Sequence, residues 1–119
     1  MSDTQFWPTE IRLGRDRHTL AVTYDDGRSD ELEAEYLRVE SPSAEVQGHT
    51  PDQKQLVSGK KNVAITAVEP IGSYAVKLTF SDGHSTGIYS WSYLRNLADH
   101  RERLWEKYLN DLAEKGLSR

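Results

Sequence analysis

Residues 74–91 read YAVKLTFSDGHSTGIYSW, and this stretch decides the fold that we expect for the chain. Apolar and polar side chains alternate over residues 74–80, which is typical of a strand with one buried face. Residues 81–84 follow as a tight-turn signal, because Gly83 tolerates the positive φ that such turns require. Residues 86–91 then alternate again, so the sequence predicts an antiparallel hairpin here.

The same order of signals occurs earlier in the chain. Alternating residues 10–13 and 19–24 predict two strands, and the sequence DDGR at residues 25–28 predicts a tight turn. A third strand is expected at about residues 30–34, running into residues 36–38. The first half of the chain therefore has the plan of a three-stranded unit.

The two halves match at a nearly constant spacing. Phe80, Gly83, Ser85 and Ile88 lie 56 residues after their counterparts Tyr24, Gly27, Ser29 and Leu32. Residues 93–95 repeat the Tyr-Leu-Arg of residues 36–38 after 57 residues, and a strand at 63–68 would complete the second copy. This predicts two copies of one unit, with a chance likeness between two Asp-Gly hairpins as the alternative.

Between and after the two copies, the patterns change. Residues 40–61 are rich in Ser, Pro, Gly, Gln and Lys, with a short helical turn predicted near residues 42–47, Ser41 as its cap, and an exposed loop at 53–61. A helical apolar period predicts a long C-terminal helix at about 92–115, packed on the sheet or binding a partner. Asp99, three residues before Glu102, is a candidate cap for a second helix, so a bend near Ala98 is an alternative.

These patterns indicate a single α+β domain over residues 1–119, with about six mostly antiparallel strands in two three-stranded units. At this length one two-layer core is expected, and a large enzyme cavity is excluded. The core candidates are Trp7, Leu20, Val22, Leu37, Val63, Ile65, Val76, Leu78, Phe80, Ile88, Trp91, Leu94 and Leu97.

The composition excludes several classes of function. Because there is no cysteine, disulfides, thiolate zinc sites, iron–sulfur ligation and cysteine nucleophiles are excluded, and a reducing, cytoplasmic location is expected. A net charge of −4 argues against a nucleic-acid partner. No apolar run approaches the ~18 residues of a membrane span, and no export signal opens the sequence, so no membrane partner is expected.

Acidic residues gather around the first turn. They are Asp25, Asp26, Asp30, Glu31, Glu33 and Glu35. Such a cluster indicates either a strand edge protected by charge or a docking surface for a basic partner.

No catalytic motif is present in the sequence. The four histidines form no His-Glu-x-x-His pattern, and both the Gly-x-Ser-x-Gly elbow and the phosphate-binding loop are missing. His100-Arg101-Glu102 matches part of an iron facial triad only by its residue types. We therefore expect no catalytic residue.

Two polar segments each contain one histidine, at residues 41–49 and 80–91. One interpretation is ordinary turn chemistry. The alternative is that His84 and His49 converge with Glu45 or Asp82 to bind iron or zinc weakly.

The motifs together resemble one family over roughly residues 7–97. They are WPTEI at 7–11, AEYLR at 34–38, SPSAEV at 41–46, EPIG at 69–72 and the FSDGHSTGIYSW of residues 80–91. The chain is similar to the gamma-butyrobetaine-hydroxylase-like N-terminal domain, a domain of unknown function. That family includes small stand-alone bacterial proteins, domains that precede a hydroxylase barrel, and fusions to iron–sulfur carrier ATPases.

The resemblance implies a scaffold without the zinc site of the eukaryotic hydroxylases. Three cysteines and a histidine hold that zinc, and their positions fall on Ser41, Ser43, Val46 and His84 here, so only the histidine remains. The hydroxylase activity belongs to a barrel that this chain lacks. The resemblance therefore implies a non-catalytic accessory or protein-interaction domain, linked to iron–sulfur or iron-enzyme partners. The expected interaction surface is Ser41, Pro42, Ser43, Glu45, Gln47, His49, Asp82, His84 and Thr86.

Overall fold

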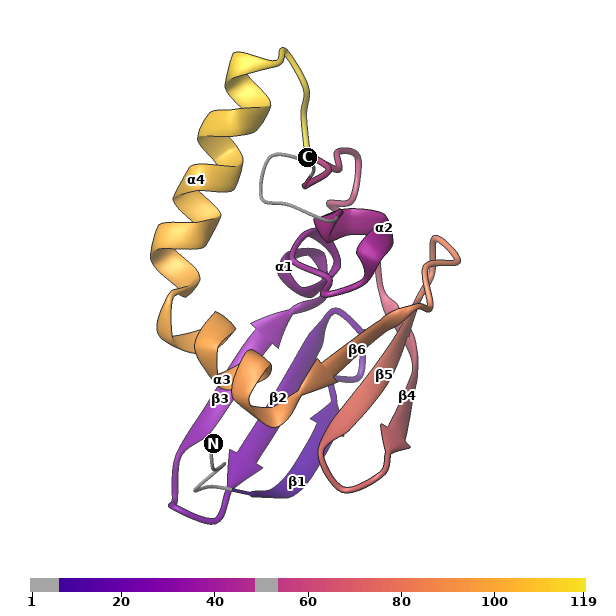
Figure 1. Cartoon of the computed structure of the whole chain (residues 1–119), viewed down its shortest axis with the longest axis vertical. Coiled ribbons are helices and arrows are strands. Elements are labelled where there is room, and N and C mark those ends of the chain that lie inside the picture. Colours follow the sequence, from indigo (N-terminus) through magenta and orange to yellow (C-terminus); the bar gives the residue numbers. More distant parts are fainter. Residues whose placement is uncertain (1–6, 49–53) are drawn as a thin grey trace.

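Two antiparallel three-stranded sheets, in the orders β1-β2-β3 and β4-β5-β6, make up the strand part of the molecule (Figure 1). The computed structural model describes residues 7–48 and 54–119. Its elements are β1 (Pro8–Leu13), β2 (Thr19–Tyr24), β3 (Ser29–Glu33), α1 (Ala34–Val39), α2 (Ala44–Gln47), β4 (Ile65–Ile71), β5 (Ala75–Phe80), β6 (Gly87–Ser90), α3 (Trp91–Asp99) and α4 (Arg101–Glu114). This confirms the predicted α+β class and its two three-stranded units.

The two sheets repeat each other in detail. The strand register shifts between Pro8 and Glu10 in β1, and again between Ile65 and Ala67 in β4, 57 residues further on in both cases. At these shifts, Thr9 Oγ1 donates to the carbonyl of Thr23 and Thr66 Oγ1 to that of Thr79, both at 3.2 Å. Each sheet then leads directly into a helix, α1 or α3. The chain is thus built from two copies of one β-β-β-α unit.

Strand pairing locates the extra residue of the second copy. Leu32 pairs with Leu20, and Tyr89 pairs with Val76, so Tyr89 rather than Ile88 is the counterpart of Leu32. The turn glycines Gly27 and Gly83 have matching φ values of 88° and 93°, which places the insertion after them. It follows that the extra residue lies between the turn and β6.

Two core candidates are therefore wrong. Ile88 is 44% exposed because the insertion shifts it to the outer face of β6, where alternate residues point away from the core. Trp7 is 47% exposed because it precedes β1 and lies outside the core cluster of the described residues. The other candidates are buried.

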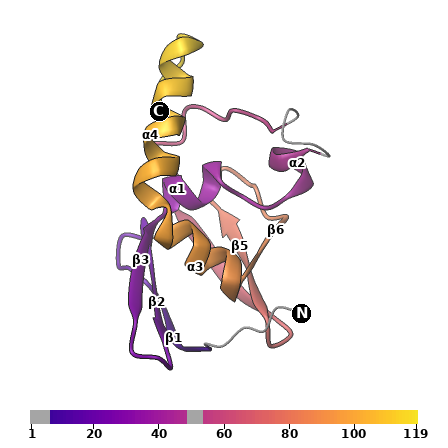
Figure 2. The same ribbon diagram turned by 60° about the vertical axis from the view of Figure 1, so that its left-hand side comes forward.

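One hydrophobic cluster joins both sheets to α1 and α3. Figure 2 shows α3 in the space between the sheets. All six residues of α1 are buried, because the helix is covered on every side. This explains why residues 36–38 form a helix instead of extending β3, as the alternating pattern suggested: a helix can bury successive residues on all its faces.

The C-terminal helix is broken, as the alternative prediction had it. α3 ends at Asp99, and His100, with φ −113° and ψ 19°, separates it from α4. Asp99 does not act as a cap, since its carboxylate accepts from Arg28 Nη2 at 2.6 Å. The short helix α2 forms as predicted, but Ser43 caps it instead of Ser41. Across residues 7–48 and 54–119, every helix is too short or too polar to traverse a lipid bilayer.

Candidate functional site

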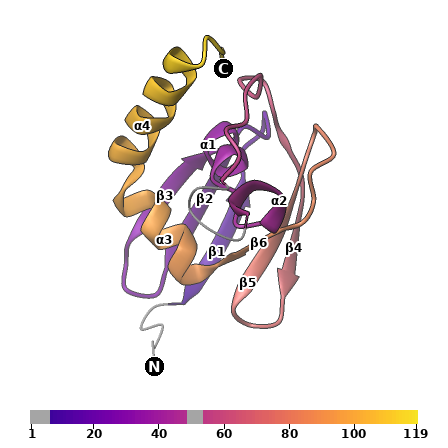
Figure 3. The ribbon, with the colours of Figure 1, turned by 45° about the horizontal axis from the view of Figure 1, so that its top comes forward.

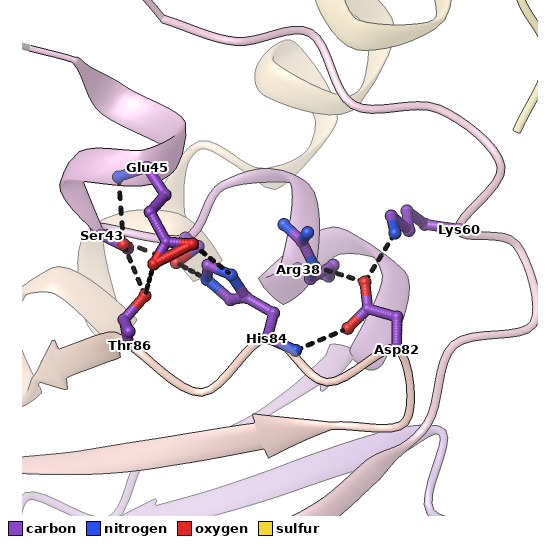
Figure 4. Close-up of polar contacts among 8 residues, drawn as sticks. Arg38, Ser43, Glu45, Lys60, Asp82, His84 and Thr86 are labelled. Carbon is purple, nitrogen blue, oxygen red and sulfur yellow. Dashed lines mark hydrogen bonds and ion pairs between the residues drawn. The ribbon is translucent and has the colours of Figure 1, made fainter.

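The two polar segments singled out in the sequence meet at one place in the fold (Figure 4). Residues 41–48 follow α1 and include α2, whereas residues 82–86 form the turn between β5 and β6. The structure brings Ser41, Ser43, Glu45, His84 and Thr86 into one hydrogen-bonded network. We call these five residues the polar cluster.

His84 lies at the centre of the polar cluster. Its side chain is 4% exposed, and its Nε2 lies 2.9 Å from Oγ of Ser41, which is fully buried. Ser41 Oγ also accepts from the backbone N–H of Ser43 at 3.2 Å. A Cβ at Gly87 would lie 2.6 Å from this oxygen, so the close approach of β6 requires glycine there.

Thr86 connects the turn to α2. Ser43 Oγ and Thr86 Oγ1 lie 2.7 Å apart, and Thr86 Oγ1 donates to Glu45 Oε2 at 2.8 Å. Ser43 Oγ also accepts from the backbone N–H of Glu45, which is the bond that caps α2. These contacts hold α2 against the second sheet.

In space, the His84 ring lies between Ser41 and Glu45, which is the arrangement of a nucleophilic triad. Nδ1 of His84 lies 3.9 Å from Oε1 of Glu45, while its Nε2 contacts Ser41. Burial lowers the pKa of His84, and the nearby Arg38 charge lowers it further, so the imidazole is neutral at neutral pH. A nucleophile must reach its substrate, however, and the zero exposure of Ser41 denies that access.

Asp82 belongs to a separate set of contacts. Its Oδ2 accepts from Arg38 Nε at 2.8 Å and from Lys60 Nζ at 2.6 Å, and its Oδ1 accepts from the His84 backbone N–H. Partial burial acts to raise the pKa of the Asp82 carboxyl, but these three donors hold it well below its usual range. Figure 4 shows the carboxylate directed toward Arg38 and Lys60, away from the His84 ring.

Of the four candidate metal ligands, the structure therefore brings together His84 and Glu45. Asp82 is engaged with two cations, and His49 lies outside the described residues. Within residues 7–48 and 54–119, no three His, Asp or Glu side chains form a group suited to a metal ion.

Three of the four positions that the resemblance relates to a zinc site lie together, but their chemistry does not suit zinc. Ser41 contacts His84 directly, and Ser43 contacts Ser41. Val46 is 2% exposed, and its side chain has no atom that can bind a metal. Neutral hydroxyls replace the thiolates that zinc prefers, so the residues do not fit that ion.

The acidic cluster around the first turn is largely neutralised. Asp30 pairs with Arg28 at 2.9 Å, Asp26 with Arg95 at 2.6 Å, and Glu33 with Arg101 at 3.0 Å. The arginines come from the turn itself, from α3 and from α4. This pairing favours a protected strand edge over a docking surface for a basic partner.

A groove that the sequence did not reveal lies next to residues 41–48. It measures about 580 Å³ and runs between α4 and residues 54–57, with apolar walls formed by Val39, Leu56, Val57, Leu104 and Tyr108. Figure 3 shows α4 on one side of α1 and α2 on the other. The adjacent apolar pair Leu56-Val57, inside a loop predicted to be exposed, was the available signal.

The rim of the groove is charged. Lys54 pairs with Glu40, and Lys107 pairs with Asp111, each at 2.7 Å. Gln47, one of the expected interaction residues, also lines the groove. Ser41, Ser43 and His84 are buried, whereas Glu45 and Thr86 reach the surface.

Three solved structures are similar to this chain over most of their own length. One solution NMR structure matches with a TM-score of 0.80 and 48% sequence identity, over 95% of this chain and 89% of that chain. A second solution NMR structure matches with a TM-score of 0.83 and 45% identity, over 100% of this chain and 90% of that chain. A crystal structure from Acidithiobacillus ferrooxidans ATCC 23270 is 44% identical, with a TM-score of 0.64, over 76% of this chain and 91% of that one. It is described as a protein with unknown function of the DUF971 family.

No curated protein matches the chain. The family model for the gamma-butyrobetaine hydroxylase-like N-terminal domain matches residues 11–95. This family is one of unknown function and is not a recognised catalytic family. The chain belongs to the gamma-butyrobetaine hydroxylase-like N-terminal family.

Proposed function

We propose that this protein is a non-catalytic protein-interaction module whose partner binds in the groove beside α4. The observation that carries the proposal is the groove itself, a concavity of about 580 Å³ with five apolar side chains in its walls. Its volume lies within the range of ligand-binding pockets, about 300–1,000 Å³. By contrast, the polar cluster uses its hydrogen bonds to join α2 to the second sheet.

The chemistry of the groove indicates its occupant. Apolar walls favour a partner segment that inserts aliphatic or aromatic side chains. Lys54, Lys107 and Asp111 reach the surface around the groove, so charges of both signs stand at the opening, whereas Glu40, the partner of Lys54, is buried. We therefore propose a protein segment with central apolar residues and flanking charges of both signs, and not a polyanion. Because of the fusions and hydroxylases of the family, iron–sulfur and iron-enzyme proteins are the partners to test first.

Site-specific photo-crosslinking in cells tests this proposal. A photoreactive residue at Lys107, on the rim, should give one discrete adduct, whereas the same residue at the exposed Arg12 of β1 should give none. Val57→Asp places a charge in the groove and should abolish the adduct, while Ala67→Asp places the same charge on an exposed strand and should not. Adducts at both positions, or at neither, would contradict a groove-specific partner.

A weak divalent-metal site is the second candidate function. The approach of His84 Nδ1 to Glu45 Oε1, at 3.9 Å, favours it, with His49 as the third proposed ligand and iron or zinc as the metal. Titration with zinc or iron(II), followed through the histidine NMR signals, should shift His84 and His49 together, and Glu45→Gln should weaken the response. If neither signal moves, the metal proposal fails.

A further inference from the structure

Glu35 is a buried carboxylate held by an arginine from the far end of the chain. It lies in the first turn of α1 and is 6% exposed. Nε of Arg119 donates to Oε2 at 3.1 Å, and Nη2 donates to Oε1 at 2.7 Å. Among the residues that the structure describes, Arg119 is the only side chain bonded to this carboxylate. A buried carboxylate without such a partner is strongly unfavourable, so the position requires a cation.

The surroundings of Glu35 select a guanidinium over an ammonium ion. The two parallel hydrogen bonds match the planar fork of arginine, which lysine cannot reproduce. The Arg119 guanidinium carbon also lies 5.3 Å from the centroid of the Trp105 ring, within the range of a cation–π contact. Beside the pocket, burial raises the pKa of Tyr108 to about 12, and the Glu35 charge contributes to this increase.

A backbone contact defines the direction of the bound segment. The N–H of Gly59 donates to the carbonyl of Ser118 at 3.0 Å, one residue before the arginine. The carboxylate, the indole ring and this N–H together recognise a residue pair, a peptide carbonyl followed by an arginine side chain. We call Glu35, Trp105 and the Gly59 N–H the arginine pocket.

The segment that fills the arginine pocket is held loosely elsewhere. After α4 the chain turns back, so that its end lies near α1 (Figure 1). Residues 115–119 are all exposed, and the apolar side chain of Leu117 leaves that residue 43% exposed. We call residues 115–119 the strap. Among the described residues, its backbone hydrogen bonds are those that end α4, from the N–H groups of residues 115–117 to carbonyls of residues 111–113, and the one from Gly59 to Ser118 in the pocket.

We propose that the arginine pocket is a recognition site for an arginine-bearing extended segment of a protein partner, and that Arg119 is its occupant in the same chain. The partner's arginine would displace the strap, take over the bidentate bond to Glu35 and stack on Trp105. This proposal deepens the proposed interaction function and rests on it. Tyr108 lines the neighbouring groove, so one partner can contact both places.

Peptide binding to the full chain tests the proposal. In the Arg119→Ala variant the pocket is free, so the peptide acetyl-Leu-Ser-Arg-amide should bind and shift the NMR signals of the Gly59 N–H and the Trp105 indole N–H. The matched lysine peptide should bind about 10-fold more weakly, because it lacks the fork. Adding Glu35→Gln to the Arg119→Ala variant should weaken binding of the arginine peptide by a similar factor. The wild-type chain should bind this peptide weakly, because its own Arg119 competes for the pocket.

Three results would overturn the proposal: no shift at Gly59 and Trp105, equal binding of the arginine and lysine peptides, or dimerisation of the wild-type chain that Arg119→Ala abolishes, which would assign the pocket to a second copy. If Arg119→Ala does not fold, Arg119→Lys keeps the charge without the fork and serves in its place. Crosslinking at Lys107 reports on the groove alone, so failure of the pocket and failure of the interaction function remain distinguishable.

Discussion

Nε of Arg38 in α1 donates to Oδ2 of Asp82 at 2.8 Å, a contact from the helix of the first unit to the turn of the second. An equivalent contact joins the helix of the second unit to the turn of the first. There, Nη2 of Arg95 in α3 donates to Oδ2 of Asp26 at 2.6 Å. Arg38 and Arg95 each end the Tyr-Leu-Arg sequence of their own unit. Asp82 and Asp26 each directly precede the turn glycine of the other unit. The helix of each unit is thereby fastened to the turn of the other.

A second reciprocal pair reinforces this junction. Tyr36 OH donates to the Leu97 carbonyl at 2.7 Å, and Tyr93 OH donates to the Glu40 carbonyl at 2.6 Å. Both tyrosines lie at the third position of their helix, and both carbonyls lie near the end of the other helix. The two copies therefore stabilise each other through matched polar contacts as well as through the shared core.

Arg38→Ala should destabilise the protein more than Arg95→Ala. Asp82 has a side chain only 19% exposed, so the loss of one of its two cations is costly even though Lys60 remains, whereas Asp26 is 39% exposed. We expect a loss of about 2–3 kcal/mol for Arg38→Ala in urea unfolding, and a clearly smaller loss for Arg95→Ala because solvent screens its contact with Asp26. Equal losses would show that burial does not distinguish the two contacts.

Gly87→Ala should cost about 1–3 kcal/mol, because its Cβ would lie 2.6 Å from Ser41 Oγ. Removing that oxygen relieves the closest contact, so the cost of Gly87→Ala should be smaller in a Ser41→Ala background. The measurement is a double-mutant cycle by denaturant unfolding. Strictly additive losses would mean that the two positions do not collide.

His84 should make the stability depend on pH. Its pKa is lowered in the folded state by burial, so the unfolded chain binds the proton more readily below about pH 6.5. The neutral imidazole therefore makes its full contribution to the free energy of unfolding above about pH 6.5. This contribution is lost as the pH falls toward the lowered pKa of the folded state. The free energy of unfolding at pH 7.5, 6.5 and 5.5 should fall less in His84→Gln than in the wild type. Parallel profiles would contradict this role, since His18, His49 and His100 are common to both proteins.

Tyr36→Phe and Tyr93→Phe should each destabilise the protein by about 1 kcal/mol, because each leaves a helix-end carbonyl without its donor. Burial raises the pKa of Tyr93 to about 12 and that of Tyr36 above its usual value, so neither phenol ionises near neutral pH. Thermal and urea unfolding of the two variants checks the losses. If Tyr36→Phe left the free energy of unfolding unchanged, the Leu97 carbonyl would have found another donor.

Local patterns in the sequence determined the strand part of the fold. Alternation over residues 19–24 and 75–80 and the Asp-Gly turns predicted the hairpins, because period-two burial and a positive φ at Gly27 and Gly83 are properties of a few neighbouring residues. The spacing of the two halves likewise revealed the duplication. The broken C-terminal helix was among the predicted alternatives.

Only the tertiary structure decided what surrounds these elements. Residues 34–39 form a helix because the fold covers them on all sides, and Ile88 points outward because one inserted residue shifts β6. The Ser41–His84 bond, the groove and the arginine pocket join residues far apart in the chain. Alternation and turn signals describe neighbours along the chain, whereas these sites exist only where packing of the two units and α4 brings distant segments into contact.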